Sequence, residues 1–281
     1  MIKLKRKKSS YVGALLIDII CILFSFICIY PVFWLLMSAL KDNTEFILNS
    51  VALPTHLNFS NFPEAIKIGH VFTAMGNSAF YATVEIVLVN AGAFITSYFL
   101  SRFDFKGKKL VSTLYLFGML VPLYALLVPV FVQWRLLGLL NNRISLVITY
   151  FAMQMPIALF LYESFIKGIS CEIEDAATID GCSIWQTLSM VIFPLCKPIM
   201  GTVSILTMIQ VWNEFAFSVI LTSRTDLRTV SVAVRSYSSS ERVQYTFMFA
   251  GLTVVTLPII IAYSIFSKQI IQGMTAGAVK G

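Results

Sequence analysis

The sequence predicts an all-α, polytopic membrane protein, and its composition and its long apolar stretches both support this fold class. Of its 281 residues, 58% are hydrophobic and only 12% are charged, and the mean hydropathy is +0.82. A soluble domain is about 45–50% apolar and about 25% charged, so this chain has too few ionic groups to cover a water-facing globule. The apolar stretches do not alternate with the period of two that a barrel strand requires.

Six helices are therefore expected to cross the membrane, since each stretch holds the roughly 20 apolar residues that a span needs. In chain order the spans are predicted at residues 14–40, 76–100, 110–134, 144–165, 199–223 and 243–267. The longest connection follows the first span and predicts a surface loop with a short helix around residues 63–68. Seven of the nine prolines lie in or beside the spans and predict bends, because each frees a backbone carbonyl one turn earlier. Such bends are either tolerated kinks or the curvature of a bundle around a pathway.

The distribution of basic residues predicts the orientation of the spans. Five of the first eight residues are Lys or Arg, and four more lie at positions 102–109, after the second span. Bases beside a span face the cytoplasm, so both termini are expected there. The first apolar run is longer than the core of a signal peptide and is expected to remain as an anchor. The net charge of +7 is thus assigned to topology and lipid contact, with no nucleic-acid partner.

Residues suited to covalent chemistry or metal binding are scarce. The five cysteines show no Cys-x-x-Cys spacing, and both histidines lie outside the predicted spans. This pattern supports neither a zinc site nor a disulfide framework. The sequence also lacks the Gly-x-x-x-x-Gly-Lys-Ser/Thr loop that binds nucleotide phosphates. We expect no catalytic residue, no metal and no cofactor bound by this chain, so a partner or an ion gradient must supply the energy.

Residues 166–197, between the fourth and fifth predicted spans, carry the clearest signal, and we call them the acidic loop. Three acids open a short helix there, where they complement the positive helix end. Gly181 is expected to end that helix, and Ser183 with Gln186 has the spacing of a capping box at the start of a second one. An acidic helix with small side chains suits a basic groove on a partner. Its acidic and small residues are Glu172, Glu174, Asp175, Ala176, Ala177 and Asp180.

The acidic loop resembles a known family motif. Glu174-Asp-Ala-Ala-Thr-Ile-Asp-Gly181, followed after nine residues by Val191-Ile-Phe-Pro194, is similar to the EAA motif of binding-protein-dependent ABC importer permeases. Further stretches resemble the carbohydrate branch, especially permeases like the second membrane subunit of the maltose importer. These stretches are Pro31–Lys41, Asn77-Ser78, Ser101–Lys108, Trp212–Phe215 and Gln272–Gly281.

The resemblance implies a single transmembrane permease domain over residues 1–281, in the cell membrane of a prokaryote. It implies a second homologous permease subunit, a dimer of cytoplasmic ATP-binding subunits that hold ATP and magnesium, and an extracytoplasmic substrate-binding protein as partners. The acidic loop would dock on the ATP-binding subunit through Glu174, Asp175, Ala176, Ala177, Asp180 and Gly181. The chain would be a transport subunit for a sugar or oligosaccharide rather than an enzyme.

Polar residues within the spans are candidates for the pathway. Ionisable groups inside a membrane face protein or water and are functional candidates by default. Gln210, Asn213 and Glu214 could bind sugar hydroxyls or meet the binding protein, or Glu214 could make a buried structural contact. A different reading is a stand-alone ion-coupled transporter that uses Glu85 or Glu214, although a structural partner is favoured for Glu85.

The segment from Arg224 to Arg242 holds four arginines and the serine run 238–240. The resemblance implies that this segment faces the substrate-binding protein. A solvated loop held by lipid headgroups explains the same composition.

Overall fold

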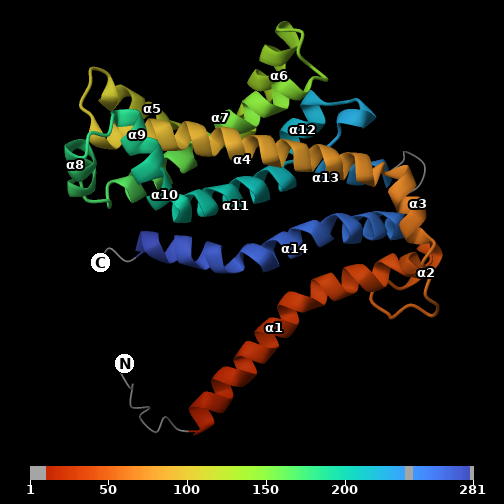
Figure 1. The fold of residues 1–281 in the computed structure, drawn as a ribbon. Coiled ribbons are helices and arrows are strands. Elements are labelled where there is room, and N and C mark those ends of the chain that lie inside the picture. The colour runs from red at the N-terminus through yellow and green to blue at the C-terminus, as the bar shows by residue number, and fades with distance from the viewer. Residues whose placement is uncertain (1–10, 238–242, 279–281) are drawn as a thin grey trace. The chain divides into compact units, whose positions relative to one another are not determined.

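The computed structural model describes residues 11–237 and 243–278, which form helices and short connections (Figure 1). The N-terminal basic cluster and the serine run 238–240 lie outside the described residues. The chain divides into two compact units, which are described separately. The first holds residues 1–69 and 237–254, and the second holds residues 70–236 and 255–281.

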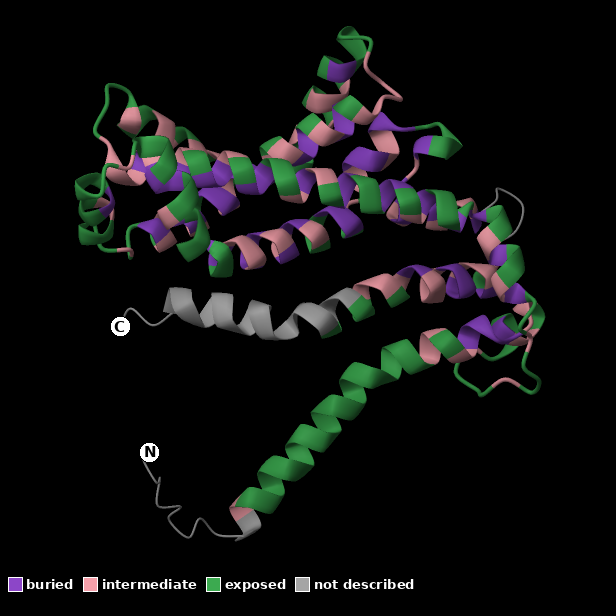
Figure 2. Ribbon diagram, viewed as in Figure 1, coloured by how far each residue is buried: buried purple, intermediate pink, exposed green. Residues whose placement is uncertain are grey.

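The first unit begins with α1, Tyr11–Ala39, a helix of 29 residues that agrees with the predicted span 14–40. Nearly all of its apolar side chains are exposed as far as Phe33 (Figure 2). Apolar side chains that touch no other part of the chain suit lipid or a neighbouring apolar helix. The last turn of α1 is buried, from Ser38 onward, so the helix is anchored at this end.

The connection after α1 contains α2, Asn43–Leu48, and α3, Asn61–Ile68. The latter confirms the short helix expected around residues 63–68. Three aromatic rings join the end of α1 and this connection to the first turns of α14, Tyr245–Ala278. Trp34 and Phe46 lie with their ring centroids 5.1 and 5.0 Å from that of Phe249.

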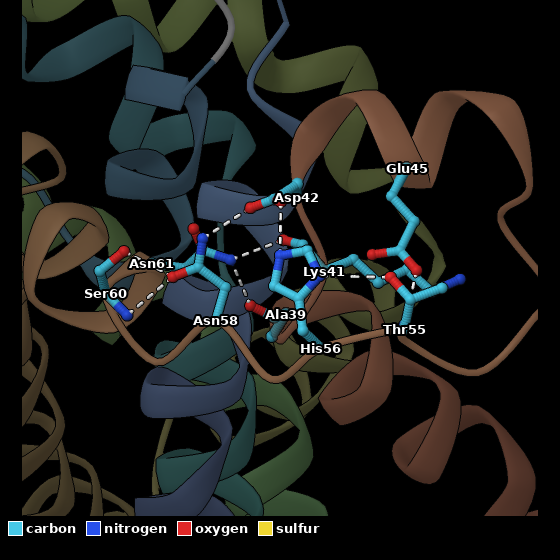
Figure 3. A network of polar contacts seen from close by, with 9 residues as sticks. All are labelled: Ala39, Lys41, Asp42, Glu45, Thr55, His56, Asn58, Ser60 and Asn61. Atoms are coloured by element: carbon cyan, nitrogen blue, oxygen red, sulfur yellow. Dashed lines mark hydrogen bonds and ion pairs between the residues drawn. The ribbon is translucent and has the colours of Figure 1, made fainter.

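A polar network fixes the chain directly after α1 (Figure 3). Asn61 donates from its side-chain amide to the carbonyls of Ala39 and Lys41, each at 2.8 Å. Asp42 binds Asn58 and His56, each at 2.7 Å. The hydrogen bonds from Asn58 and then His56 hold the pKa of Asp42 below its usual range. The Asn61 amide thus supplies a partner for the Ala39 carbonyl at the end of α1, which has no partner within the helix.

Tyr237 links two segments of the first unit. Its hydroxyl donates to the carbonyl of Ala65 at 2.8 Å and lies between Gly69 and Gly251. A Cβ built on either glycine would come within 2.8 or 2.7 Å of the Tyr237 Cζ atom, respectively. Glycine is therefore required on both sides of this ring, because it lets the backbone approach closely.

The second unit is built on three helices that lie side by side (Figure 1). They are α4, Val71–Arg102, α7, Arg143–Ile166, and α11, Lys197–Asn213. Small residues on α4, such as Ala93 and Ser97, are fully buried. The Ser97 hydroxyl donates across to the Leu159 carbonyl of α7 at 3.2 Å. Such residues let helix backbones approach closely in a membrane.

Two predicted features of the second unit are bent. The span expected at 110–134 is formed by a helix before Pro122 and a second helix after it, with a bend of 99°. Pro122 explains the break because it cannot donate the hydrogen bond that a continuous helix needs. The bent elements are α5, Lys108–Leu120, η1, Leu123–Leu126, and α6, Leu127–Leu136.

The second bend, of 72°, separates Ile184–Leu195 from α11, and it lies between Pro194 and Pro198. Its first arm contains α9, Ile184–Gln186, the π-helix η2, Thr187–Ile192, and α10, Phe193–Leu195. After α11 the chain forms short elements before α14. They are α12, Ala216–Leu221, η3, Thr225–Leu227, α13, Val230–Ala233, and η4, Val234–Tyr237.

Several of these helices are suited to a bilayer by length and composition. Among the described residues, Gly13–Ala39, Val71–Arg102 and Arg143–Ile166 are long and apolar enough to cross it. The number rises to five if each bent pair is one span. The all-α, polytopic fold class is confirmed in this form.

Candidate functional site: the acidic loop and a polar cavity

The acidic loop contains the predicted short helix. This helix is α8, Glu172–Ile179, with three acids in its first turn. It ends as expected at Gly181, whose φ of +84° lies in the left-handed region. The Gly181 and Cys182 amides donate back to the carbonyls of Thr178 and Ala177 at 3.0 and 2.9 Å. This pair of bonds is a Schellman motif, which satisfies the last carbonyls of the helix.

The predicted capping box is present directly after this turn. The Gln186 side chain accepts from the Ser183 amide at 2.8 Å, and the Ser183 hydroxyl accepts from the Gln186 amide at 3.4 Å. Together the two motifs fix the angle between α8 and the elements that lead into α11. The loop is thus a helix, a sharp turn and a second helix, as the sequence predicts.

Glu174 is bound within the chain rather than exposed. The Arg102 Nε atom donates to Glu174 Oε1 at 2.5 Å, and the Tyr98 hydroxyl donates to Oε2 at 2.9 Å. Arg102 also donates to the Ile169 carbonyl at 2.8 Å. The Arg102 and Glu174 side chains are only 10% and 15% exposed. These bonds attach α8 to the last turn of α4.

The remaining predicted docking residues divide by burial. Ala177 is buried against the chain. The other four are exposed, together with Ile179, which is 85% exposed. An exposed face of mixed acidic, small and apolar character is available for a partner. Its predicted members are Asp175, Ala176, Asp180 and Gly181.

The three predicted pathway residues lie together at one cavity. This cavity, of about 350 Å³, lies where α11 gives way to α12. Gln210 is exposed, and its side chain forms no hydrogen bond within the described residues. Its polar and aromatic lining is suited to a ligand with hydroxyl groups. We call it the polar cavity, and its polar and tyrosine lining residues are Tyr124, Tyr150, Gln154, Gln210, Asn213 and Glu214.

Glu214 is held by hydrogen bonds at the rim of the polar cavity. Its carboxylate accepts from the Tyr150 hydroxyl at 2.7 Å and from the Phe217 and Ser218 amides at 2.7 and 3.0 Å. It thus satisfies the free amides at the start of α12. The sequence placed Gln210 and Glu214 on one helix face, but α11 ends at Asn213. The carboxylate therefore has a structural role as well as a place in the cavity.

Glu85 is fully buried in α4, and neither oxygen of its carboxyl has a hydrogen-bond partner among the described residues. It does not line the polar cavity. The structural partner favoured from the sequence is therefore not found in this part of the chain.

Sequence reasoning missed the residues that complete both sites. Tyr98 and Arg102, which bind Glu174, are four residues apart on one face of α4, a spacing that the sequence displays without indicating the partner. Tyr150 and Gln154 share a face of α7 in the same way, and the buried Gln154 Oε1 atom has no partner among the described residues. The sequence signal for these residues was a pair of polar side chains four positions apart within an apolar span, which indicates a polar helix face.

Bent apolar helices around a polar cavity, joined to an exposed acidic helix, define a membrane transport subunit. Residues 89–276 match the family of the binding-protein-dependent transport system inner membrane component, and the chain belongs to this family. It is a multi-pass permease of the bacterial inner membrane and not itself an ATPase. Because transport in this family depends on a binding protein, the stand-alone ion-coupled alternative is set aside.

Curated relatives match nearly the whole chain. The diacetylchitobiose uptake system permease protein NgcG of Streptomyces coelicolor is 31% identical over 258 residues, which are 91% of this chain and 85% of the relative. The trehalose transport system permease protein SugB of Mycobacterium tuberculosis is 30% identical over 254 residues, which are 89% of this chain and 92% of the relative.

A solved structure shares the fold. It is a bacterial ABC transporter involved in the import of the acidic polysaccharide alginate. The match has a TM-score of 0.79 at 22% identity and covers 93% of this chain and 98% of that one.

Proposed function

We propose that this chain is a membrane subunit of an ATP-driven importer for a sugar or oligosaccharide. The family match over residues 89–276 carries the proposal. The named substrates of its relatives, which include diacetylchitobiose, trehalose and arabinooligosaccharides, support the substrate class. The subunit works with a second homologous permease, a dimer of cytoplasmic ATP-binding subunits and an extracytoplasmic substrate-binding protein.

The proposed subunit crosses the membrane six times, with both termini in the cytoplasm. Three long helices, two bent pairs and the 34-residue α14 accommodate the six spans. The basic residues at 102–109 and in the N-terminal cluster support the orientation. The acidic loop is then cytoplasmic, and the segment 224–236 is extracytoplasmic.

The acidic loop docks on the ATP-binding subunit through the exposed face of α8. Asp175, Asp180 and the apolar Ile179 supply that face, while Glu174 and Ala177 hold α8 against its own chain. The partner subunit binds ATP and magnesium, and its hydrolysis of ATP moves α8. The six predicted docking residues therefore divide into four on the exposed face (Asp175, Ala176, Asp180 and Gly181) and two that position α8 (Glu174 and Ala177).

The polar cavity is the part of the pathway that this subunit supplies. Gln210 and Asn213 offer amides that can both donate to and accept from sugar hydroxyls. Tyr124, which is exposed, adds a flat apolar face for the sugar ring, whereas the buried Tyr150 holds Glu214. Glu214 mainly holds the rim of the cavity, because its carboxylate already accepts three hydrogen bonds.

The test replaces one exposed leucine or isoleucine at a time. Ile179→Glu puts a charge on the docking face of α8, whereas Leu48→Glu changes an equally exposed residue (86%) in the connection after α1. We expect Ile179→Glu to abolish co-purification of the ATP-binding subunit and ATP-driven sugar uptake while the permease stays in the membrane. Leu48→Glu should retain the ATP-binding subunit. Equal retention by both variants would contradict the proposed docking face.

A further inference from the structure

Residues 47–59 cover the last turn of α2 and the connection to α3, and we call them the apolar segment. Six of these thirteen side chains are large, apolar and between 55% and 86% exposed. A single exposed leucine is ordinary, whereas six in one short stretch mark a surface that binds a membrane or another protein. They are Ile47, Leu48, Val51, Leu53, Leu57 and Phe59.

The apolar segment is held beside the end of α1. The indole Nε1 atom of Trp34 donates to the Ser50 carbonyl at 2.9 Å. Trp34 lies within the candidate span Gly13–Ala39, about 7.5 Å before its end at 1.5 Å per residue. The backbone amide of Asn58 donates to the Leu40 carbonyl, directly after the same helix, at 2.8 Å. Two fixed points, at Ser50 and Asn58, thus hold the segment at the level of the last turns of α1.

The aromatic residues near these fixed points are of the kinds that gather at a membrane surface. The ring of Phe46 lies with its centroid 6.0 Å from that of Trp34 and 5.5 Å from that of Tyr245. Tryptophan and tyrosine are enriched at the level of the lipid headgroups. Residues 46–63 also contain no Lys, Arg, Asp or Glu, so no charge opposes shallow insertion into hydrocarbon.

The polar side chains of the apolar segment are already hydrogen-bonded within the chain. The Asn49 side chain accepts from two following backbone amides at 3.2 and 3.1 Å. Figure 3 shows His56 and Asn58 both bound to Asp42. A protein partner would need directed bonds, about one for each 100–200 Å² of interface. Hydrocarbon needs none, so lipid suits this surface better than a protein does.

We propose that the apolar segment lies in the outer leaflet of the bilayer, with its exposed side chains among the acyl chains just below the headgroups. The proposal rests on the proposed function only for the side of the membrane, because six spans with cytoplasmic termini place the connection after α1 outside. The exposed apolar side chains of α1 continue as far as Phe33, and the segment extends that surface where Trp34 binds Ser50. It thereby fixes the depth of the outer end of α1.

The test uses the complete transporter in phosphatidylcholine nanodiscs. A fluorescent amino acid replaces Leu53 in one preparation and Glu64, an exposed residue of α3, in the matched control. Both preparations should elute as the wild-type complex in size-exclusion chromatography. Iodide in the buffer should quench the probe at position 53 about threefold less than at position 64, because an interfacial side chain is shielded from water. A lipid nitroxide near the headgroup should quench position 53 more than position 64, and more than a nitroxide at the end of the acyl chain does.

Three outcomes overturn the proposal. Equal iodide quenching at both positions would mean that the apolar segment faces water. Resistance of position 53 to both quenchers would assign the surface to a protein neighbour within the transporter. Protection from iodide that arises only after the binding protein is added would assign it to that partner.

The proposed function is tested separately, by sugar uptake into proteoliposomes. Absence of ATP-driven uptake by the wild-type transporter, with the quenching pattern as expected, would contradict that function and leave the lipid contact in place.

Discussion

Among the described residues, Arg102 and Glu174 form the least exposed ion pair. Removing one partner of such a pair leaves an uncompensated charge with little access to water. The pair joins residues 72 positions apart, so local sequence patterns could predict that Glu174 begins a helix but not that Arg102 binds it. Only the packing of α4 beside the acidic loop brings the two together.

We predict that Arg102 and Glu174 are energetically coupled. Arg102→Gln or Glu174→Gln alone should lower the free energy of unfolding by about 3 kcal/mol. The double variant should lose less than the sum, with a coupling of about 1–3 kcal/mol. Reversible unfolding in detergent micelles, followed by circular dichroism, measures this cycle. Asp175→Asn, at the exposed neighbouring position, is the control, and strictly additive losses would contradict the prediction.

A pair of glycines gives a second prediction at this scale. Gly69→Ala should destabilise the first unit, because the new Cβ would lie against Tyr237 and force the ring from its hydrogen bond to Ala65. The expected loss is about 1–3 kcal/mol. Gly76→Ala has no atom within 4 Å of its Cβ and should stabilise α4 by up to about 1 kcal/mol. Thermal unfolding of the two variants compares them, and a stable Gly69→Ala variant would argue against the close approach of Tyr237.

At the scale of elements, apolar length predicted the helices well and their interruptions poorly. The helices α1, α4 and α7 begin and end within a few residues of the predicted spans. The span expected at 199–223 instead stops at Asn213, since Glu214 adopts an extended conformation and its carboxylate binds the first amides of α12. Hydropathy carries no information about such a side-chain contact. The turn after α8 was predictable because the glycine and capping-box spacing are local.

Gly181 provides the prediction for this scale. Its φ of +84° is costly for a residue with a Cβ, by roughly 1–2 kcal/mol, and more for a branched side chain. Gly181→Val should therefore reorient α8 and remove ATP-driven uptake, although nothing within 4 Å would clash. Gly201→Ala, also without neighbours within 4 Å but inside a helix, should retain uptake. Full uptake by Gly181→Val at equal membrane abundance would contradict this role of the turn.

At the scale of the molecule, charge placement predicts the topology. A fluorescent reporter fused after Gly281 should be active, and an alkaline phosphatase fused there should be inactive, because both termini are expected in the cytoplasm. The phosphatase inserted after Thr225 should be active. The reverse pattern would invert the proposed sides of the acidic loop and of the segment 224–236. The sequence could not predict the polar cavity as a whole, because its lining comes from η1, α7, α11 and α12, which are distant in the chain.

The fastening of α4 at both ends has a mechanical consequence. Near its C-terminal end, Arg102 forms an ion pair with Glu174 of the acidic loop. Near the other end, Asn77 donates to the Asp226 and Arg228 carbonyls, and Ser78 accepts from the Val230 amide. The helix between Asn77 and Arg102 measures roughly 38 Å at 1.5 Å per residue. Because one continuous helix without an internal proline joins the two attachments, we expect a displacement of the acidic loop to be transmitted to residues 226–230.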